Sequence, residues 1–345
     1  MNSKDLLFTL TAACASSGTE QGLAEMAAKL FEPYCHTRVD QNGNLIATLK
    51  EPHPTQKGDA LPHHLMLDAH LDEIGLVVTG ITEEGFVKAA AVGGLDQRLL
   101  LASEVVLHGK EEVYGIFSAT PPHLQSEEER KKPLPLNRCY IDTGYTKEEL
   151  EGKISLGDHG TFIGPAAQLL NGRIVSKSLD NRASCAVLVK TAQLLAQAPP
   201  SCQVSFVLSV KEEVNAAGAK TAAFALKPTH AIAVDVSFAV APGVPEKEAR
   251  GELGDGALIS FSPVLDRQMS NALIELAKEK QIPYYVEAGG GRTYTNADAI
   301  APSGEGVITS VVSVPLRYMH TPVEVCQEDD IDHIASLLFH YAHTL

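Results

Sequence analysis

Two hydrophobic patterns alternate along most of the chain, and together they predict an α/β domain. Short continuous apolar runs are typical of buried strands, and apolar residues at helical spacing are typical of helices. Strands are predicted at residues 37–40, 45–49, 65–70, 173–178, 203–209, 230–235, 258–261, 283–286 and 307–314. Helices are predicted at residues 4–14, 181–196, 216–226, 268–280 and 329–343. This alternation favours a mostly parallel sheet with helices on both faces.

Turn and capping residues refine the first part of this pattern. Gln41-Asn42-Gly43 predicts a hairpin turn between the first two strands. Ser17 and Glu20 have the spacing of a capping box for a second helix, whose buried stripe would be Leu23, Met26 and Leu30. The polar segment 52–62 is rich in Pro and Gly and is predicted to be a surface loop.

Between residues 76 and 161 the pattern changes to closely spaced short apolar runs separated by Gly, Pro and charged turns. These runs fall at residues 76–78, 86–92, 104–107, 113–117 and 139–141. Such spacing predicts a small β-rich domain inserted into the α/β chain. We therefore expect residues 1–70 and 160–345 to form the main domain and residues 71–159 to form the insertion. The charged run at 126–132 is predicted to be an exposed loop.

Side chains that bind metals or move protons are clustered at the end of the predicted strand 65–70 and just after it. They are Asp68, His70, Asp72 and Glu73. Open α/β sheets present their sites at the carboxyl ends of strands. Further acidic and imidazole side chains stand at or near other predicted strand ends, at Asp180, Glu212, Glu213, Asp235 and His320. Parallel strands end at one edge of a sheet, so these groups are predicted to converge there.

Each of these residues, taken alone, also has an ordinary structural explanation. Asp180 suits a helix N-cap, and Glu212 and Glu213 suit a helix start, where the dipole favours negative charge. His70 suits a hydrogen-bonded histidine at a strand end. Asp235 is harder to explain, because its apolar neighbours imply burial and a buried lone carboxylate is costly. The joint pattern is therefore the stronger evidence.

The combined set of two histidines and three carboxylates suits Zn²⁺, Co²⁺ or Mn²⁺, which accept nitrogen and oxygen ligands. Five protein ligands exceed what one catalytic zinc needs. A pair of ions sharing one carboxylate fits better, and such pairs lie ~3.5–4 Å apart in hydrolases.

Composition limits the possible partners and location. The chain has 345 residues, 44% of them hydrophobic, which is enough for two domains. Its formal charge of -15 argues against nucleic acid as a partner, because phosphates would be repelled. The six cysteines form no C-x-x-C pair, which favours reduced thiols in a cytoplasmic protein. The N-terminus only weakly resembles a signal peptide, and no apolar run approaches the ~20 residues of a membrane span.

Several motifs, in order along nearly the whole chain, resemble those of the M42 family of metallo-aminopeptidases, which includes glutamyl, deblocking and tetrahedral aminopeptidases. They are Ala-His-Leu-Asp-Glu-Ile-Gly at 69–75, Leu-Asp-Asn-Arg at 179–182, Glu-Glu-Val at 212–214 with Gly-Ala at 218–219, Val-Asp-Val at 234–236, and Pro-Leu-Arg-Tyr-Met-His-Thr-Pro-Val-Glu at 315–324. Weaker matches are Val-Gly-Gly at 92–94, Pro-His-Leu at 122–124 and Gly-Asp at 157–158.

The resemblance implies a phosphorylase/peptidase-like zinc-peptidase fold and two divalent ions per subunit, most often Zn²⁺. It implies that Asp180 bridges the ions, His70 and Asp235 complete one shell, and Glu213 and His320 complete the other. Glu212 would be the general base that takes a proton from a bridging water and gives it to the leaving amine. Asp72 would accept a hydrogen bond from His70 and set its tautomer. The substrates would be peptides, and the insertion would be a dimerisation domain that builds a tetrahedral dodecamer.

Departures from the family pattern leave substrate preference open. They are Ala183-Ser184-Cys185 after Asn-Arg, Asn215 after Glu-Glu-Val, and Asn296-Ala297-Asp298-Ala299 where a Thr-Asp-Ala is usual. Adjacent Glu212 and Glu213 can share one centre only if the backbone has left the strand, since neighbouring strand residues point to opposite faces.

Two alternatives to the peptidase stand beside it. Relatives carry cellulase-type labels, and paired carboxylates also cut sugars, but such chemistry needs no histidine. Carbohydrate sites also favour aromatic platforms, whereas this chain has no Trp and 6% aromatic residues. The other alternative is a peptide-binding scaffold with decayed catalysis, against which the retention of Glu212 argues.

Overall fold

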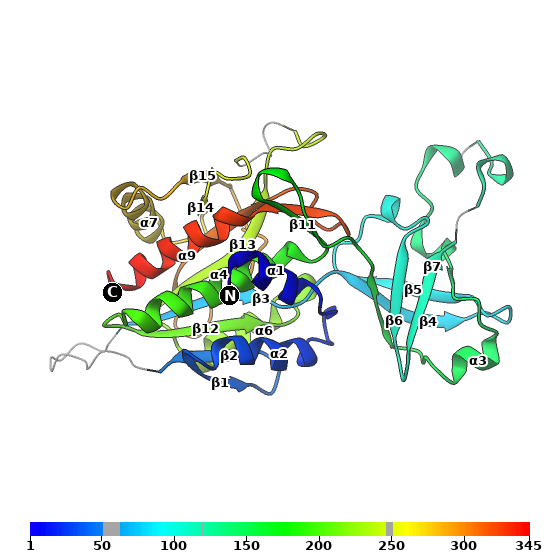
Figure 1. Ribbon diagram of the computed structural model, residues 1–345, viewed down its shortest axis with the longest axis horizontal. Coiled ribbons are helices and arrows are strands. Elements are labelled where there is room, and N and C mark those ends of the chain that lie inside the picture. The colour runs from blue at the N-terminus through cyan, green and yellow to red at the C-terminus, as the bar shows by residue number, and fades with distance from the viewer. Residues whose placement is uncertain (51–62, 119, 128, 246–250) are drawn as a thin grey trace.

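The computed structural model describes residues 1–50, 63–118, 120–127, 129–245 and 251–345. The predicted loop at 52–62 lies outside the described residues. Figure 1 shows an α/β domain that contains both termini and a smaller barrel beside it.

The α/β domain is built on an eight-stranded sheet whose centre is parallel. In spatial order its strands are β1 (Cys35–Val39), β2 (Leu45–Leu49), β12 (Gln203–Ser209), β3 (His64–His70), β13 (His230–Phe238), β16 (Ile308–Leu316), β14 (Ala257–Phe261) and β15 (Tyr284–Ala288). The central strands β12, β3, β13 and β16 pair in parallel, whereas β1 with β2, β2 with β12 and β14 with β16 pair antiparallel. The sheet is therefore mixed, and the expected parallel arrangement holds at the centre. Hydrophobic patterning sets which face a strand buries but does not set its direction.

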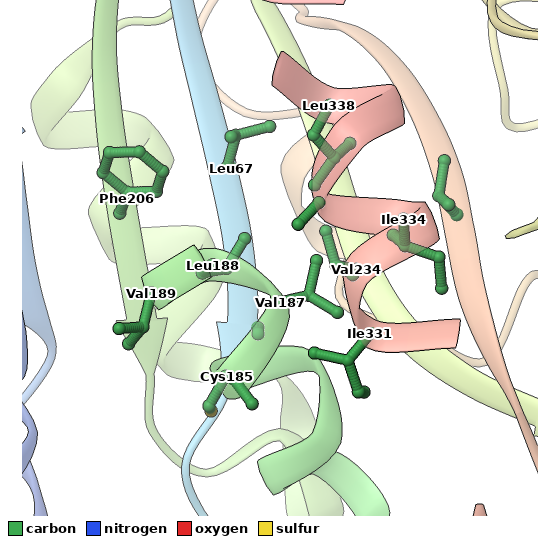
Figure 2. Close-up of a cluster of buried hydrophobic side chains, with 14 of the residues drawn as sticks. Leu67, Cys185, Val187, Leu188, Val189, Phe206, Val234, Ile331, Ile334 and Leu338 are labelled. Atoms are coloured by element: carbon green, nitrogen blue, oxygen red, sulfur yellow. The ribbon is translucent and has the colours of Figure 1, made fainter. Parts of the chain in front are cut away.

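Alternation along the central strands assigns each face of the sheet its own partners. In β3, Leu65 and Leu67 belong to the larger core, and Met66 belongs to a smaller core on the other face. The larger core is covered by α1 (Ser3–Thr11), α2 (Gln21–Phe31), α4 (Leu179–Gln197), α7 (Arg267–Glu279) and α9 (Glu328–Ala342). Figure 2 shows α4 and α9 side by side, with Val187 and Ile334 facing the sheet residues Leu67 and Val234.

The opposite face of the sheet has less cover. Its helices are α6 (Ala217–Leu226) and α8 (Ala297–Ile300), which pack alanines and Ile300 against Met66 and Val207. Asp68 and His70 have the same parity as Met66, so their side chains leave β3 on this face. The less covered face, at the carboxyl end of the strands, is therefore where a site can open.

The residues between the two parts of the α/β chain form a closed barrel with its own core. Its strands, in order around the barrel, are β4 (Gly75–Ile81), β5 (Val87–Val92), β8 (Ile141–Asp142), β7 (Glu112–Phe117), β6 (Glu104–His108) and β9 (His159–Phe162). Leu76, Leu107, Val113 and Phe162 are buried in that core. The short helix α3 (Lys147–Glu151) lies between β8 and β9 in the chain.

The remaining elements are short. A three-stranded antiparallel sheet contains β10 (Ala167–Gln168), β11 (Arg173–Ser176) and β17 (Glu324–Gln327), and α5 (Glu212–Asn215) is a single turn. The 3-10 turns are η1 (Gln97–Leu99), η2 (Pro122–Leu124), η3 (Glu129–Lys131), η4 (Leu136–Arg138) and η5 (Leu170–Gly172). Across the described residues, no helix combines the length and apolar character needed to cross a membrane. All six cysteines are free.

The predicted capping box at Ser17 and Glu20 is wrong. Helix α2 begins at Gln21, and its N-cap residue Glu20 makes no side-chain cap. Ser17 Oγ instead donates to Asp72 Oδ2 at 2.6 Å, and Glu20 Oε1 accepts from the backbone N–H of Lys211 at 3.0 Å. Both side chains are used by tertiary partners, which a local motif cannot reveal.

Arg182 joins three parts of the α/β domain. Its guanidinium is fully buried and donates to the carbonyl oxygens of Leu71 at 2.6 Å, Leu10 at 2.8 Å and Ala13 at 3.1 Å. Its Nη2 also lies 3.6 Å from Glu73 Oε1. The start of α4, the end of α1 and the segment after β3 are thereby held together.

Replacing Arg182 should destabilise the fold, because the carbonyls of Leu10, Ala13, Ala15 and Leu71 and the Glu73 carboxylate would lose a charged partner. We expect Arg182→Met to lower the free energy of unfolding by about 3–5 kcal/mol, measured by urea denaturation. The exposed Arg267 provides a matched control, since Arg267→Met should change the free energy of unfolding by no more than about 0.5 kcal/mol. Equal effects of the two substitutions would contradict this role.

Candidate metal centre

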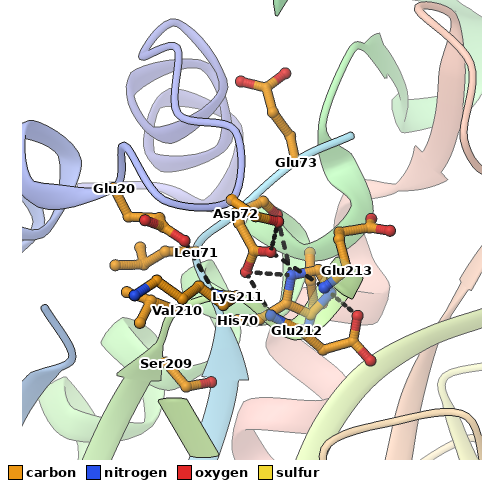
Figure 3. Close-up of polar contacts among 12 residues, drawn as sticks. Glu20, His70, Leu71, Asp72, Glu73, Ser209, Val210, Lys211, Glu212 and Glu213 are labelled. Carbon is orange, nitrogen blue, oxygen red and sulfur yellow. Dashed lines mark hydrogen bonds and ion pairs between the residues drawn. The ribbon is translucent and has the colours of Figure 1, made fainter. Parts of the chain in front are cut away.

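The five side chains predicted as metal ligands lie together at the carboxyl edge of the central strands. Asp180 stands between two imidazoles, with Oδ1 at 3.2 Å from His70 Nε2 and Oδ2 at 3.2 Å from His320 Nε2. Asp235 Oδ1 lies 3.9 Å from His70 Nε2, and Glu213 Oε1 lies 3.5 Å from His320 Nε2. Figure 3 shows His70, Glu212 and Glu213 approaching one another from β3 and α5.

These residues form overlapping groups with the spacing of metal ligands. One group is His70, Asp180 and Asp235, and another is Asp180, Glu213 and His320; in each, the ligand atoms lie within 4.8 Å of one another. A third group is His70, Glu212 and Glu213. The first two groups share Asp180, as a bridging carboxylate would require.

The elements that deliver these residues differ in part from the expected ones. Asp235 lies inside β13, which continues to Phe238, and Asp180 follows β11, which belongs to the three-stranded sheet. The residues therefore do not all come from the ends of parallel strands. His320 lies in the loop after β16 with a φ of 62°.

Glu212 and Glu213 reach the same centre because the backbone leaves the strand before them. Strand β12 ends at Ser209, Lys211 has a φ of 62°, and Glu212 opens the helical turn α5. Successive residues of a helical turn are about 100° apart in direction, rather than on opposite faces. The difficulty posed by two adjacent glutamates is thereby removed.

Backbone carbonyls orient both imidazoles. His70 Nδ1 lies 3.0 Å from the carbonyl oxygen of Asp72, and its distance to the Asp72 carboxylate is 3.5 Å. His320 Nδ1 lies 3.0 Å from the carbonyl oxygen of Gly94. A proton on each Nδ1 leaves each Nε2 with a lone pair facing Asp180. His70 Nδ1 thus lies closest to the Asp72 backbone carbonyl, with the expected carboxylate partner slightly farther away.

Gly94, which follows the barrel strand β5, brings the backbone of that segment into contact with the centre. A Cβ atom at this position would lie 2.7 Å from His320 Nδ1 and 2.9 Å from its Cε1. Only glycine permits this approach without displacing the imidazole. This contact explains the second glycine of the Val-Gly-Gly motif at 92–94.

Two buried carboxylates fix the backbone of four site residues. The Asp72 carboxylate accepts from the N–H groups of Glu212 at 3.0 Å and Glu213 at 3.1 Å. The Glu324 carboxylate accepts from the N–H groups of Asp180 at 3.0 Å and His320 at 2.8 Å. Asp72 thus positions α5, and Glu324 positions Asp180 and His320.

Sequence reasoning missed Glu324 as a functional residue, although this residue ends the longest family-like motif.

Asp68 and Glu73, from the acidic cluster around His70, stay outside the metal-ligand groups. Asp68 is fully buried and accepts from Asn296 Nδ2 at 2.7 Å, and Glu73 pairs with Lys177 Nζ at 2.8 Å. Both act in support of the loop and strand that carry His70.

Burial and mutual repulsion dominate the electrostatics of the centre. Burial raises the pKa of Glu213 to about 8, with the Asp180 charge adding to the effect. Burial likewise raises the pKa of Glu212 and places the pKa of Asp235 well above its usual range. Burial opposes ionisation of Asp180, but hydrogen bonds from His320 and His70 hold its pKa below the usual range.

These donors fit divalent cations. Imidazole nitrogens and carboxylate oxygens are the ligands that Zn²⁺, Co²⁺ and Mn²⁺ take, and buried carboxylates held at this spacing are stabilised by positive charge. His70 and Asp235 would hold one ion, Glu213 and His320 the other, and Asp180 both.

An α/β fold with this centre is that of a metal-dependent hydrolase, and comparison with known proteins makes the assignment specific. The family described as M42 glutamyl aminopeptidase matches residues 43–337. The chain therefore belongs to this family, which is metal-dependent, and it is a hydrolase that acts on peptides. The predicted resemblance is confirmed.

Individual relatives agree with the family. A putative aminopeptidase of Acetivibrio thermocellus is 34% identical over 343 residues, covering 97% of this chain and 96% of that protein. The lysyl aminopeptidase of Pyrococcus furiosus is 31% identical over 327 residues, covering 93% and 91%. The solved structure of the Pyrococcus horikoshii TET1 peptidase, described as assembling into a tetrahedron or a large octahedral shell, has a TM-score of 0.85 at 29% identity and covers 100% of both chains.

Glu324→Gln should weaken metal binding while keeping the shape of the side chain. An amide offers one acceptor oxygen, so the N–H of Asp180 or of His320 would lose its partner. We expect the metal affinity to fall about 10–100-fold, as for other supporting residues around metal ligands, measured by titration against a competing chelator. The exposed Glu279→Gln should leave the affinity unchanged. An unaltered metal affinity in Glu324→Gln would mean that the Glu324 carboxylate does not position the ligands Asp180 and His320.

Proposed function

We propose that the protein is a dinuclear metal-dependent aminopeptidase that removes residues from the N-terminus of peptides. The observation that carries this proposal is the pair of ligand groups that share Asp180. Two divalent ions, Zn²⁺ before Co²⁺ or Mn²⁺, would when bound lower the pKa of a water and polarise the scissile carbonyl.

Glu212 is the general base of this proposal. Its Oε2 lies 3.9 Å from His70 Nε2, and it lines the same cavity as Asp180, Asp235 and His320. Because burial raises its pKa, its carboxylate has a higher affinity for a proton than an exposed glutamate. Glu212 accepts the proton of the attacking water and later donates it to the leaving amine.

The position of Glu212 depends on Asp72, which accepts from its backbone N–H. Asp72 is itself held by Ser17 Oγ, so its carboxylate is fixed from two sides. We therefore assign Asp72 a positioning role for Glu212, in addition to the orientation of His70 by its carbonyl.

We also propose a homo-oligomer in which the barrel is the dimerisation domain. The barrel strands run from residue 75 to residue 162, so they start within the insertion expected at 71–159 and end three residues after it. Strand β7 alternates in burial, and it exposes Tyr114 and Ile116 on the outside of the barrel. A related TET1 structure is described as a dodecamer, which supports a dodecamer for this chain as well. A cytoplasmic location follows from the free cysteines and stays a prediction.

Glu212→Gln tests the proposed base. The amide cannot accept a proton, so we expect at least a 100-fold loss in kcat, at about the scale of general-base catalysis, with metal content close to that of the unaltered protein. Assays would use aminoacyl-anilides, and metal would be measured by mass spectrometry. The neighbouring Glu213→Gln is the matched control and should lose metal as well as activity. Loss of metal in Glu212→Gln would make Glu212 a ligand instead.

Asp180→Ala tests the bridge. Removing the shared carboxylate should empty at least one metal position, because each of the two ligand groups that share Asp180 would keep only two members. Metal stoichiometry measured after dialysis should fall below two per subunit, whereas Asp332→Ala, on the surface of α9, should leave it unchanged. An unaltered stoichiometry in Asp180→Ala would refute the bridging role.

A further inference from the structure

The cavity that holds the candidate metal ligands contains a further acidic side chain. It reaches from Asp180 and Asp235 along the sheet to Ser237, Ser260 and Glu287. Glu287 lies on β15 and is half-buried. It belongs to none of the metal-ligand groups found among the described residues.

Two hydroxyl groups fix the carboxylate of Glu287. Ser237 Oγ donates to Oε2 at 2.8 Å, and Ser260 Oγ donates to Oε1. Ser260 is also the register neighbour of Glu287 between β14 and β15. A carboxylate has about four acceptor positions, so Glu287 can accept further hydrogen bonds from a group in the cavity. Its position is set by three strands of the sheet rather than by a loop.

The position of Ser237 sets how far Glu287 lies from the metal ligands. Asp235 and Ser237 are two residues apart on β13, so their side chains leave the same face. Their Cα atoms are about 6–7 Å apart along the strand. Glu287 is hydrogen-bonded to Ser237. Its carboxylate therefore lies about as far from the centre, where the scissile bond would sit, as one long side chain such as lysine can reach.

The other charged groups lining this cavity do not neutralise Glu287. The Asp298 carboxylate accepts from the backbone N–H groups of Thr293 at 2.9 Å and Tyr294 at 3.1 Å, and so holds its own loop. Arg292 is exposed, and within the described ranges no ion pair joins it to Glu287. Among the described residues, no cation therefore pairs with the Glu287 carboxylate, which lines the cavity.

We propose that Glu287 makes the subsite for the N-terminal side chain selective for lysine and arginine. The proposal rests on the aminopeptidase function proposed above. An ammonium or guanidinium group would form charge-assisted hydrogen bonds with Glu287. The methylene stem would pack along Phe261 and Val264, which line the same cavity. The formal charge of -15 further concentrates cationic peptides near the protein.

The test compares kcat/KM of the metal-loaded enzyme for Lys-, Arg-, Leu- and Glu-p-nitroanilides. We expect the unaltered enzyme to prefer Lys and Arg over Leu by at least about tenfold, and Glu287→Gln to reduce that preference by about tenfold with little change for Leu. Glu287→Arg should shift the preference towards Glu. Glu305→Gln, on the surface, should change nothing. Cleavage of Leu-anilide shows that each variant is folded.

A second readout does not require turnover. Binding of free L-lysine, measured by calorimetry, should be at least about tenfold tighter than that of L-norleucine, which has the same stem without the ammonium group, and Glu287→Gln should remove the difference. Preference of the unaltered enzyme for Leu or Glu, or an unchanged Lys to Leu ratio in Glu287→Gln, would overturn the inference alone. Failure to cleave any anilide would instead overturn the aminopeptidase proposal.

Discussion

The confinement of several buried carboxylates in one small space is the constraint on which the centre depends. Asp180, Glu213 and Asp235 approach the same two imidazoles within hydrogen-bond or near-contact distances. Negative charges brought this close and removed from water repel one another, and burial raises the pKa of Glu213 and Asp235 accordingly. Cations bound between these groups would relieve both the repulsion and the cost of desolvation. This need for positive charge agrees with the metal dependence of the peptidase family to which the chain belongs.

Much of the surrounding structure keeps these charges in place. Asp72 and Glu324 each accept from the backbone N–H groups of two site residues. Asp72 holds two adjacent residues of α5, and Glu324 joins Asp180 and His320, which come from separate elements. Arg182 anchors the segment after β3 to α1 and α4. Gly94 lets the barrel side contact His320. The centre is therefore assembled from the main sheet, the small sheet and the barrel together, and its geometry depends on how these parts pack.

The sequence predicts the elements of the α/β domain and the composition of the centre well, because both depend on local patterns. The apolar run at 203–209 marks β12, and the acidic and imidazole residues stand out against apolar strands. It does not predict the antiparallel flanks of the sheet, since direction leaves no mark on a hydrophobic pattern. Ser17, Glu20 and Glu324 also elude it, because each has a partner distant in the chain, namely Asp72, Lys211 and Asp180. A side chain that caps a helix also looks the same in sequence as one that supports a loop. Glu287 appears as an ordinary strand residue until the fold brings it within hydrogen-bond distance of Ser237 on β13 and Ser260 on β14.

Anomalous diffraction from crystals of the zinc-loaded protein tests the central claim most directly, because it locates ions independently of activity. The account predicts two peaks about 3.5–4 Å apart, one beside His70 and Asp235, the other beside Glu213 and His320, with Asp180 between them. A single peak, or two peaks that do not share Asp180, would contradict it.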